Sequence, residues 1–222
     1  MCGRFTMATP GQTIAELFRL DETPELSPRF NIAPTQAVAA VRARRDDGRE
    51  LVALTWGLVP SWAKDRAMGA RMINARAETV AEKPAFRAAL RVRRCLVLAD
   101  GFYEWQKLGT RKQPHHIRLR DGRPFAFAGL WERWAPPGAE PVESCTIITT
   151  TPSALVAPIH DRMPVILAAD AIGTWLDPSA REPAAIVSLL RPYPADEMVA
   201  YPVSLRVNNP GADDPSCVAP LT

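Results

Sequence analysis

Proline is the feature of this sequence that most limits what the chain can fold into. The chain has 222 residues, of which 22 are proline, and the segments between the prolines are short. A proline inside a helix removes a hydrogen bond and clashes with the preceding turn, so this spacing leaves little room for long helices. The sequence therefore favours many brief strands joined by loops.

Two pairs of apolar, β-branched segments have turn signals between them. Residues 36–44 and 50–56 flank Asp47-Gly48, and residues 114–120 and 123–131 flank Asp121-Gly122. Because Asp-Gly between two such segments is typical of a tight hairpin turn, both pairs are predicted to form β-hairpins. Further strands are predicted over residues 93–100, 144–151, 163–168 and 202–207.

Helices are predicted to be fewer and short. Thr9 and Ser179 are candidate N-caps of helices over residues 9–20 and 179–190, and other helices are expected near residues 84–91, 153–157 and 170–176. Strands dominate and lack regular alternation with helices. We therefore expect an α+β fold with a mainly antiparallel, barrel-like curved sheet and short flanking helices. A single domain is expected over residues 1–208, followed by a loose C-terminal tail over 209–222.

Composition excludes several classes of protein. Hydrophobic residues make up 47% and charged residues 23% of the chain, as in globular proteins. The longest uncharged stretch, near residues 144–159, is too short for a membrane span. No apolar leader follows the N-terminus, so a cytoplasmic protein is expected. The four cysteines are far apart and contain no C-x-x-C pair, which argues against a structural metal site and a disulfide framework.

Positive charge is concentrated in one segment. The net charge of the chain is +3, yet residues 66–94 contain seven Arg and one Lys against two Glu. Such a segment indicates an anionic partner, or it is simply the solvated face of a basic helix. From charge alone the two interpretations are equally good.

The second residue of the chain is a cysteine, in the N-terminal sequence MCGRF. Aminopeptidases remove an initiator methionine when the next side chain is small, so the mature chain is expected to begin with the α-amine and thiol of Cys2. The reference pKa values of these groups are about 8 and about 8.5, so both are expected to be partly available as nucleophiles. Such an aminothiol can form an imine with an aldehyde and close a thiazolidine ring, or can attack an amide. Considered alone, an inert cysteine is the more frequent outcome.

Three polar side chains stand in contexts that suit proton transfer or substrate orientation. Glu104 lies between Tyr103 and Trp105, just after an apolar predicted strand. Desolvation by these aromatic neighbours can raise the pKa of its carboxyl toward neutrality. In the alternative interpretation Glu104 is the solvent-facing residue of an alternating strand. His160 precedes a predicted strand and is expected on a loop, although a lone histidine is more often structural. Asn74 can orient an amine or a hydroxyl, or can serve in a turn or cap.

Two tryptophans lie on either side of Pro60 in WGLVPSW, just before the basic segment. Aromatic side chains interleaved with arginines hold unpaired bases while the arginines contact phosphates. Trp56 ends an apolar strand and is expected in the core. The sequence leaves two interpretations of Trp62, a core position and a surface on which a base can stack.

Six motifs resemble those of the SOS-response-associated peptidase (SRAP) family: MCGRF, RFNIAPTQ, WGLVPSW, NARAET, CLVLADGFYEW and IHDRMPVIL. The resemblance runs from Cys2 to the PVSLRVN segment near residue 208. It implies a protein that recognises abasic sites in single-stranded DNA and links to them through the N-terminal cysteine as a thiazolidine, which shields the lesion. It implies Cys2 as nucleophile, Asn74 as the group that orients it, and Glu104 and His160 as acid/base groups.

The resemblance also implies which residues contact DNA. Backbone contacts, stacking surfaces and the lining of the site would come from Arg4, Pro34, Trp62, Arg76, Trp105, Thr149 and Arg162. No metal or other cofactor is implied. The protein is expected to be a monomer that associates with the nucleoid after damage and has lyase-like or peptidase-like chemistry.

Two other functions stay open from the sequence. Cys2 can act as the nucleophile of a thiol peptidase or autopeptidase, including removal of Met1 from its own chain. Alternatively, the protein is a non-catalytic module that binds single-stranded DNA and in which Cys2 is incidental.

Overall fold

The computed structural model describes residues 2–44, 48–138 and 140–221. Its strands are β1 (Phe5–Met7), β2 (Arg29–Ile32), β3 (Ala37–Ala43), β4 (Arg49–Trp56), β5 (Asn74–Arg76), β6 (Arg94–Ala99), β7 (Gly101–Leu108), β8 (Arg111–Leu119), β9 (Phe125–Trp134), β10 (Val142–Thr150), β11 (Met163–Pro164) and β12 (Met198–Pro202). Its α-helices are α1 (Gly11–Phe18), α2 (Arg87–Val92), α3 (Ala171–Leu176) and α4 (Pro183–Val187). Short 3₁₀ helices cover Arg66–Arg71, Ala195–Glu197, Leu205–Asn208 and Pro215–Cys217.

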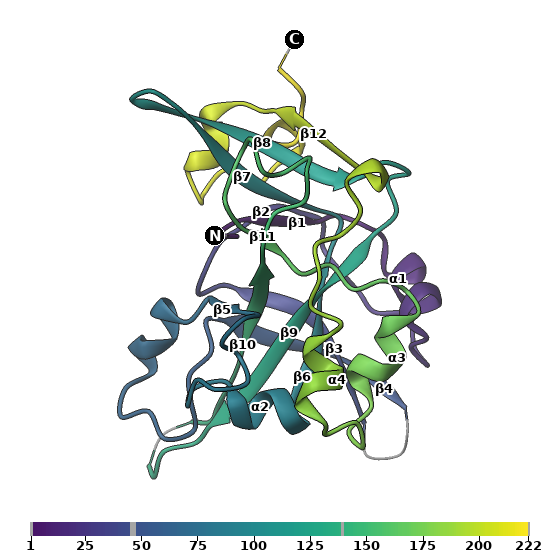
Figure 1. Ribbon diagram of the computed structural model, residues 1–222, viewed down its shortest axis with the longest axis vertical. Coiled ribbons are helices and arrows are strands. Elements are labelled where there is room, and N and C mark those ends of the chain that lie inside the picture. The colour runs from purple at the N-terminus through teal and green to yellow at the C-terminus, as the bar shows by residue number, and fades with distance from the viewer. Residues whose placement is uncertain (1, 45–47, 139, 222) are drawn as a thin grey trace.

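Five strands close into a barrel, which forms the lower half of the molecule in Figure 1. The strand order is β10-β4-β3-β6-β9, and β9 pairs back onto β10. These pairs are antiparallel except for β4 with β10, which are parallel. Closure removes the unpaired edges that an open sheet would expose. β5 and β11 both pair with the C-terminal half of β10.

A second, antiparallel sheet lies above the barrel in Figure 1 and has the order β12-β8-β7-β1-β2. A single residue, Asp100, separates β6 of the barrel from β7 of this sheet. The Asp100 carboxylate accepts hydrogen bonds from the Thr6 hydroxyl and from the backbone N–H groups of Ala8 and Thr9, at 2.6 to 2.9 Å. The N-terminal strand is thus tied to the junction of the two sheets, and the predicted α+β, barrel-like single domain is confirmed.

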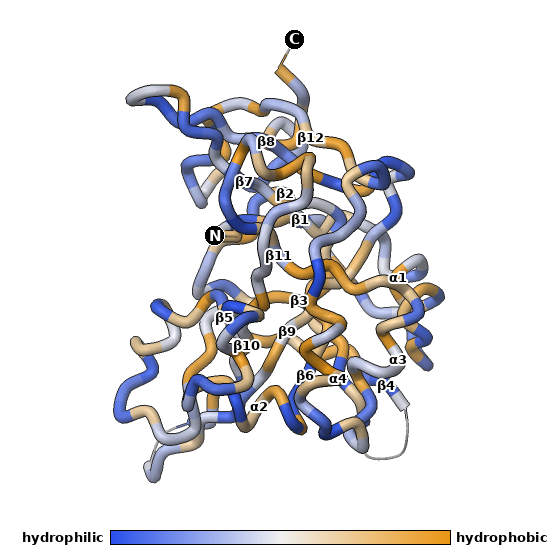
Figure 2. The backbone as a smooth tube through the Cα atoms, viewed as in Figure 1, coloured by the Kyte–Doolittle hydropathy of each residue, from blue (hydrophilic) through white to orange (hydrophobic). Residues whose placement is uncertain are grey.

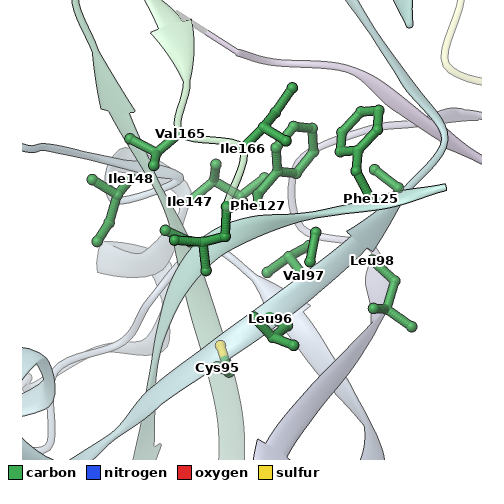
Figure 3. Packing of buried hydrophobic residues seen from close by; sticks show 14 of the residues in the cluster. Cys95, Leu96, Val97, Leu98, Phe125, Phe127, Ile147, Ile148, Val165 and Ile166 are labelled. Atoms are coloured by element: carbon green, nitrogen blue, oxygen red, sulfur yellow. The ribbon is translucent and has the colours of Figure 1, made fainter. Parts of the chain in front are cut away.

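The barrel strands supply most of the core. Hydrophobic residues concentrate along them, whereas the loops are more polar (Figure 2). β6 is buried at all six positions, since it lies between other strands and is packed by α3. Figure 3 shows its side chains beside those of β9, β10 and the segment after β11, namely Leu96, Val97, Leu98, Phe125, Phe127, Ile147, Ile148, Val165 and Ile166. Each large apolar side chain buried in this way contributes about 1.5 to 3 kcal/mol.

One of the two predicted hairpins is confirmed and the other is wrong. β3 and β4 pair from Ala37↔Thr55 to Ala43↔Arg49; residues 45–47 of their predicted turn lie outside the described residues. The chain also turns at Gly122, which has φ +75°, but β8 and β9 do not pair. β8 instead pairs with β7, and the turn carries the chain from one sheet to the other. Local turn chemistry marks a change of direction and does not choose the partner strand.

Other local predictions also changed in the structure. The segment 202–207 forms the end of β12 and a 3₁₀ helix instead of a strand, and residues 153–157 form turns instead of a helix. α1 and α4 exist, but no side chain caps either N-terminus. The Thr9 hydroxyl donates to Asp100 at 3.0 Å instead. A tertiary partner has displaced the local cap.

The segment after Asn208, expected to be a loose tail, packs against β2. Asp213 forms an ion pair with Arg29 and accepts from the backbone N–H of Asn31 at 2.9 Å. Ala212 and Cys217 are buried. The sequence did not reveal this packing because the segment is short and its partners lie more than 180 residues earlier.

The basic segment is not one uniform surface. Arg94 is buried and donates to carbonyl oxygens of α2 and α3 and of the residue after α3, including Leu90 at 2.7 Å. Arg93 pairs with Glu132 at 2.7 Å. These two arginines therefore stabilise packing. None of the helices in the described part of the chain has the length and hydropathy that a membrane-spanning helix needs.

Candidate functional site

The register of β1 and β7 brings the N-terminus to Glu104. Phe5 pairs with Phe102, and the Tyr103 N–H donates to the Arg4 carbonyl at 3.0 Å. Because the strands are antiparallel, the residues before Phe5 lie beside those after Tyr103. Cys2 and Glu104, more than 100 residues apart in sequence, therefore belong to the same site.

The Cys2 side chain is fully buried. Its Sγ lies 4.0 Å from the carbonyl oxygen of Arg4. Burial and the nearby Glu104 carboxyl raise the pKa of the thiol well above its usual range. With Met1 present the thiol is therefore protonated, and a base must generate the thiolate during reaction. The expectation of a partly ionised thiol concerns the chain that begins at Cys2 and stays a prediction.

Glu104 is buried within β7, so its interpretation as a solvent-facing strand residue is wrong. Desolvation raises the pKa of its carboxyl from 4.5 to about 7, and the nearby Asp161 carboxylate adds to the effect. The predicted shift toward neutrality is confirmed. A carboxyl of this pKa can both donate and accept a proton near pH 7.

His160 lies at the end of a series of turns over residues 153–160, with its Nε2 3.8 Å from Glu104 Oε2. Burial lowers the pKa of its imidazole below the usual value. The Arg162 backbone N–H donates to Nδ1 at 3.0 Å, and Asp161 Oδ1 lies 2.9 Å from the same nitrogen. The neutral ring can accept from Arg162 and the protonated ring can donate to Asp161, so both protonation states have a partner at Nδ1.

Asn74 begins β5, which pairs in parallel with β10 at Ile147. Its Nδ2 donates to the Ile73 carbonyl at 3.0 Å and to the Ile147 carbonyl at 3.4 Å. Its Oδ1 is buried and has no hydrogen-bond partner within residues 2–44, 48–138 and 140–221. A buried acceptor without a partner is costly, so Asn74 is suited to receive a donor such as an amine. Among the same residues, no hydrogen bond joins Asn74 to Cys2.

Arg162 is the best-anchored arginine of the predicted DNA contacts. It donates to the carbonyl oxygen of Thr149 at 2.6 Å and forms a bidentate ion pair with Glu78 at 2.6 and 2.9 Å. Thr149 is buried on β10. Arg162 and Thr149 thus lie together, next to His160.

The other two predicted arginines differ from each other in their surroundings. Arg4 donates to Asn31 Oδ1 at 2.9 Å and to the Val207 carbonyl at 2.7 Å, so its guanidinium helps to hold the N-terminal strand. Arg76 is exposed at the end of β5. Arg76 is therefore the one more accessible to a phosphate.

The predicted apolar contacts also fall into two groups. Trp62 is 57% exposed, which suits stacking on a base, whereas Trp56 is fully buried as expected. Trp105 is half-buried and donates through Nε1 to Asn208 Oδ1 at 2.8 Å. Pro34 is half-buried in the loop before β3. DNA contacts by Pro34, Trp62 and Trp105 stay a prediction.

Two acidic residues of the site were missed from the sequence. Asp161 contacts the His160 ring, and Glu78 pairs with Arg162, 84 residues away. Asp161 could have been suspected from its position beside the histidine. Glu78 lies in the NARAET motif, but the sequence does not show its pairing with Arg162, because the fold supplies that partner. Within the described parts of the chain, no three His, Cys, Asp or Glu side chains are grouped so as to hold a metal ion.

Together Glu104 and His160 form an acid/base pair near the buried thiol of Cys2. Near pH 7 the Glu104 carboxyl is partly protonated, and the depressed pKa of His160 favours a neutral imidazole. One group can therefore give a proton while the other takes one. Such a pair suits condensation of an amine with a carbonyl, and it also suits attack of a thiol on an amide.

Comparison with known proteins shows the family of the chain. Residues 1–210 match the family model described as SOS response associated peptidase (SRAP). The chain is 46% identical over 222 residues to the abasic site processing protein YoqW of Bacillus subtilis, covering 98% of this chain and 99% of that protein. It is 35% identical to the abasic site processing protein HMCES of Gallus gallus, covering 87% of this chain and 66% of that protein.

Solved structures show the same fold. A crystal structure of a protein from Bacteroides thetaiotaomicron covers the whole of both chains with a TM-score of 0.89 at 28% identity. A protein from Bordetella bronchiseptica has a TM-score of 0.79 at 27% identity, with 92% of this chain and 100% of that chain covered.

Proposed function

The chain belongs to the SOS response associated peptidase (SRAP) family, and we propose that it processes abasic sites in single-stranded DNA by forming a covalent crosslink through Cys2. The names of its relatives, abasic site processing proteins, support the lesion as substrate. The observation that carries the chemistry is the placement of Glu104, with a pKa of about 7, between the N-terminal strand and His160.

The first step is opening of the sugar. The closed abasic deoxyribose is a hemiacetal, and its open form is an aldehyde. The neutral His160 imidazole takes the proton of the anomeric hydroxyl, and the imidazolium then gives this proton to the ring oxygen, which leaves as a hydroxyl. Proton transfer of this kind contributes about 10² to 10⁴ in rate.

The second step joins the amine to the aldehyde. With Met1 removed, the Cys2 amine attacks the aldehyde carbon and forms a carbinolamine. The Glu104 carboxyl gives its proton to the hydroxyl of the carbinolamine, which leaves as water, and a protonated imine remains. Asn74 supports this step because its unpartnered Oδ1 can accept a hydrogen bond from the amine.

The third step closes the ring. The Glu104 carboxylate, now without its proton, accepts the proton of the Cys2 thiol, whose raised pKa makes such a base necessary. The thiolate adds to the carbon of the protonated imine, and the nitrogen, which keeps its proton, becomes the neutral ring N–H. One aldehyde and one aminothiol thus give one thiazolidine and one water.

A second function, thiol autopeptidase or peptidase activity, is favoured by one observation. Glu104 influences the Cys2 thiol closely enough to raise its pKa, so it can also serve as the base for attack on an amide. A non-catalytic DNA-binding module is the third possibility, and for it the buried acid/base pair would have no use.

A crosslinking assay separates the three functions. The protein is incubated with single-stranded DNA that carries one abasic site and is then analysed on a denaturing gel. A band that survives denaturation is expected. Absence of that band from protein with a verified Cys2 N-terminus would contradict the proposal, and peptide cleavage that depends on Cys2 would favour the peptidase.

Two variants refine the assay. Protein that retains Met1 has no Cys2 amine, so the crosslink should disappear. DNA binding by a non-catalytic module would not change when Met1 is retained. Cys2→Ala keeps an α-amine but loses the thiol, so only a labile imine that can be trapped by reduction is expected. A heat-stable crosslink from Cys2→Ala would exclude ring closure through sulfur.

A further inference from the structure

The ion pair between Glu78 and Arg162 lies beside the proposed reacting groups. The two terminal nitrogens of Arg162 donate to the two carboxylate oxygens of Glu78 at 2.6 and 2.9 Å. The Arg162 side chain is 14% exposed and that of Glu78 is 48% exposed. The backbone N–H of Arg162 donates to His160 Nδ1 at 3.0 Å, so the residue that carries this guanidinium directly contacts His160.

Arg162 does not depend on Glu78 for its position. The Thr149 carbonyl accepts from Nη2 at 2.6 Å, and Thr149 Oγ1 lies 3.4 Å from the same nitrogen. Thr149 belongs to β10, the strand that closes the barrel. The guanidinium would therefore keep its place if the Glu78 carboxylate moved away.

Glu78 also lies close to a second arginine. Arg76 and Glu78 are both exposed and lie in one turn that follows β5, in which the Thr79 backbone N–H donates to the Arg76 carbonyl at 3.1 Å. The hydrogen bonds from Arg162 hold the pKa of the Glu78 carboxyl below its usual range, and the charge of Arg76 adds to the effect. Glu78 is thus a carboxylate flanked by two cations, each a predicted phosphate contact.

A carboxylate and a phosphate bind a guanidinium in the same way. Both accept two parallel N–H bonds from its planar fork. In the structure both terminal nitrogens of Arg162 are used by Glu78. A DNA phosphate that needs the same bidentate contact must therefore displace the carboxylate.

We propose that the Glu78 carboxylate occupies the position at which Arg162 receives a DNA phosphate, and that Glu78 thereby weakens binding to undamaged strands. This inference rests on the proposed function. An undamaged strand can displace Glu78 only at the expense of the ion pair. An abasic strand must also displace Glu78, but it is afterwards retained by a covalent bond to Cys2, and Glu78 does not weaken that bond. Glu78 is thus a residue that determines specificity for the lesion.

The test compares Glu78→Gln with Glu82→Gln. Glu82 is an exposed glutamate four residues further on, so both variants change the net charge by the same amount. Affinity for an undamaged oligothymidylate is measured by fluorescence anisotropy at several salt concentrations. Glu78→Gln should bind about two- to tenfold more tightly than Glu82→Gln, as expected for loss of a half-exposed ion pair. Its salt dependence should be steeper by about one phosphate contact.

A third variant tests whether Arg162 is responsible. In an Arg162→Ala background, Glu78→Gln should raise affinity no more than Glu82→Gln does. Crosslinking to abasic DNA should be retained by Glu82→Gln, whose exposed side chain has no part in the site, so this variant is the reference for an intact site.

The opposing results are distinct. Equal affinities of Glu78→Gln and Glu82→Gln would reduce the effect to net charge and overturn the inference. Weaker binding by Glu78→Gln would mean that Glu78 holds Arg162 in place, which also overturns it. If the wild type fails to crosslink abasic DNA, the proposed function fails, whereas the comparison on undamaged strands is read independently of crosslinking.

Discussion

The carboxyl of Glu104 should make the folded protein less stable as the pH rises. Its pKa is 4.5 in an ordinary environment and about 7 in the folded protein, because it is buried. Between these values the folded state binds a proton that the unfolded state has lost. The stability that this group contributes is complete below pH 4.5 and is lost as the pH rises through 7.

The size of the effect follows from the shift. A change of one pKa unit corresponds to about 1.4 kcal/mol, so keeping an ionised carboxylate in this position costs about 3 kcal/mol at pH 8. Glu104→Gln removes the charge while preserving the shape of the side chain. The variant should gain about 3 kcal/mol relative to wild type at pH 8, and less than about 1 kcal/mol at pH 5.

The measurement is thermal unfolding of both proteins at pH 5 and pH 8. For a chain of this size 1 kcal/mol shifts the midpoint by about 2 to 4 °C, so the variant should melt about 6 to 12 °C above wild type at pH 8. Any constant effect of the amide appears at both pH values and cancels in the comparison.

A second buried glutamate provides the matched control. Glu132 is also buried but pairs with Arg93 at 2.7 Å. Glu132→Gln should therefore destabilise the protein at both pH values. If the difference between Glu104→Gln and wild type is the same at pH 5 and pH 8, burial does not penalise the Glu104 carboxylate and the reasoning is refuted.

Two further results are expected. The initial rate of crosslinking, measured as a function of pH, should be bell-shaped with a maximum between about pH 7 and 8, because the amine must be neutral and Glu104 protonated. In Glu104→Gln the decrease in rate on the alkaline side should disappear. A wild-type rate that rises steadily to pH 9 would argue against Glu104 as the acid. Gly101→Ala should lower the free energy of unfolding by about 1 to 3 kcal/mol, measured in urea, because its Cβ would overlap the His116 ring and lie 2.9 Å from Thr6 Oγ1. Gly173→Ala is the control, because Gly173 is exposed, has no positive φ and has no atom within 4 Å of an added Cβ; equal effects of the two substitutions would contradict the packing argument.

Several features of the fold were predictable because their causes are local. Alternating apolar residues around a turn signal predicted β3 and β4, and short segments between prolines predicted a fold rich in strands. The burial of Trp56 followed from its place at the end of an apolar strand. The raised pKa of Glu104 followed from its aromatic and apolar neighbours in sequence.

Features that depend on distant partners were not predictable in this way. The pairing of β8 with β7 instead of β9, and the packing of residues 209–221 on β2, are choices between partners that no short segment contains. The roles of the arginines in the basic segment also depend on distant partners. Arg93 and Arg94 became packing residues only because Glu132 and α3 were brought beside them.

The same distinction between local causes and distant partners applies to the candidate site. The sequence by itself determined the reactive groups: an aminothiol at Cys2, a carboxyl among aromatics at Glu104, and a histidine on a loop at His160. The tertiary structure alone decided their relations, through the β1–β7 register and the 3.8 Å approach of His160 to Glu104. It also decided that the Cys2 thiol is buried and that Glu78 covers Arg162. The physical reason is that the chemistry of a group belongs to its own atoms, whereas its pKa and its partners depend on what the fold places within a few ångströms.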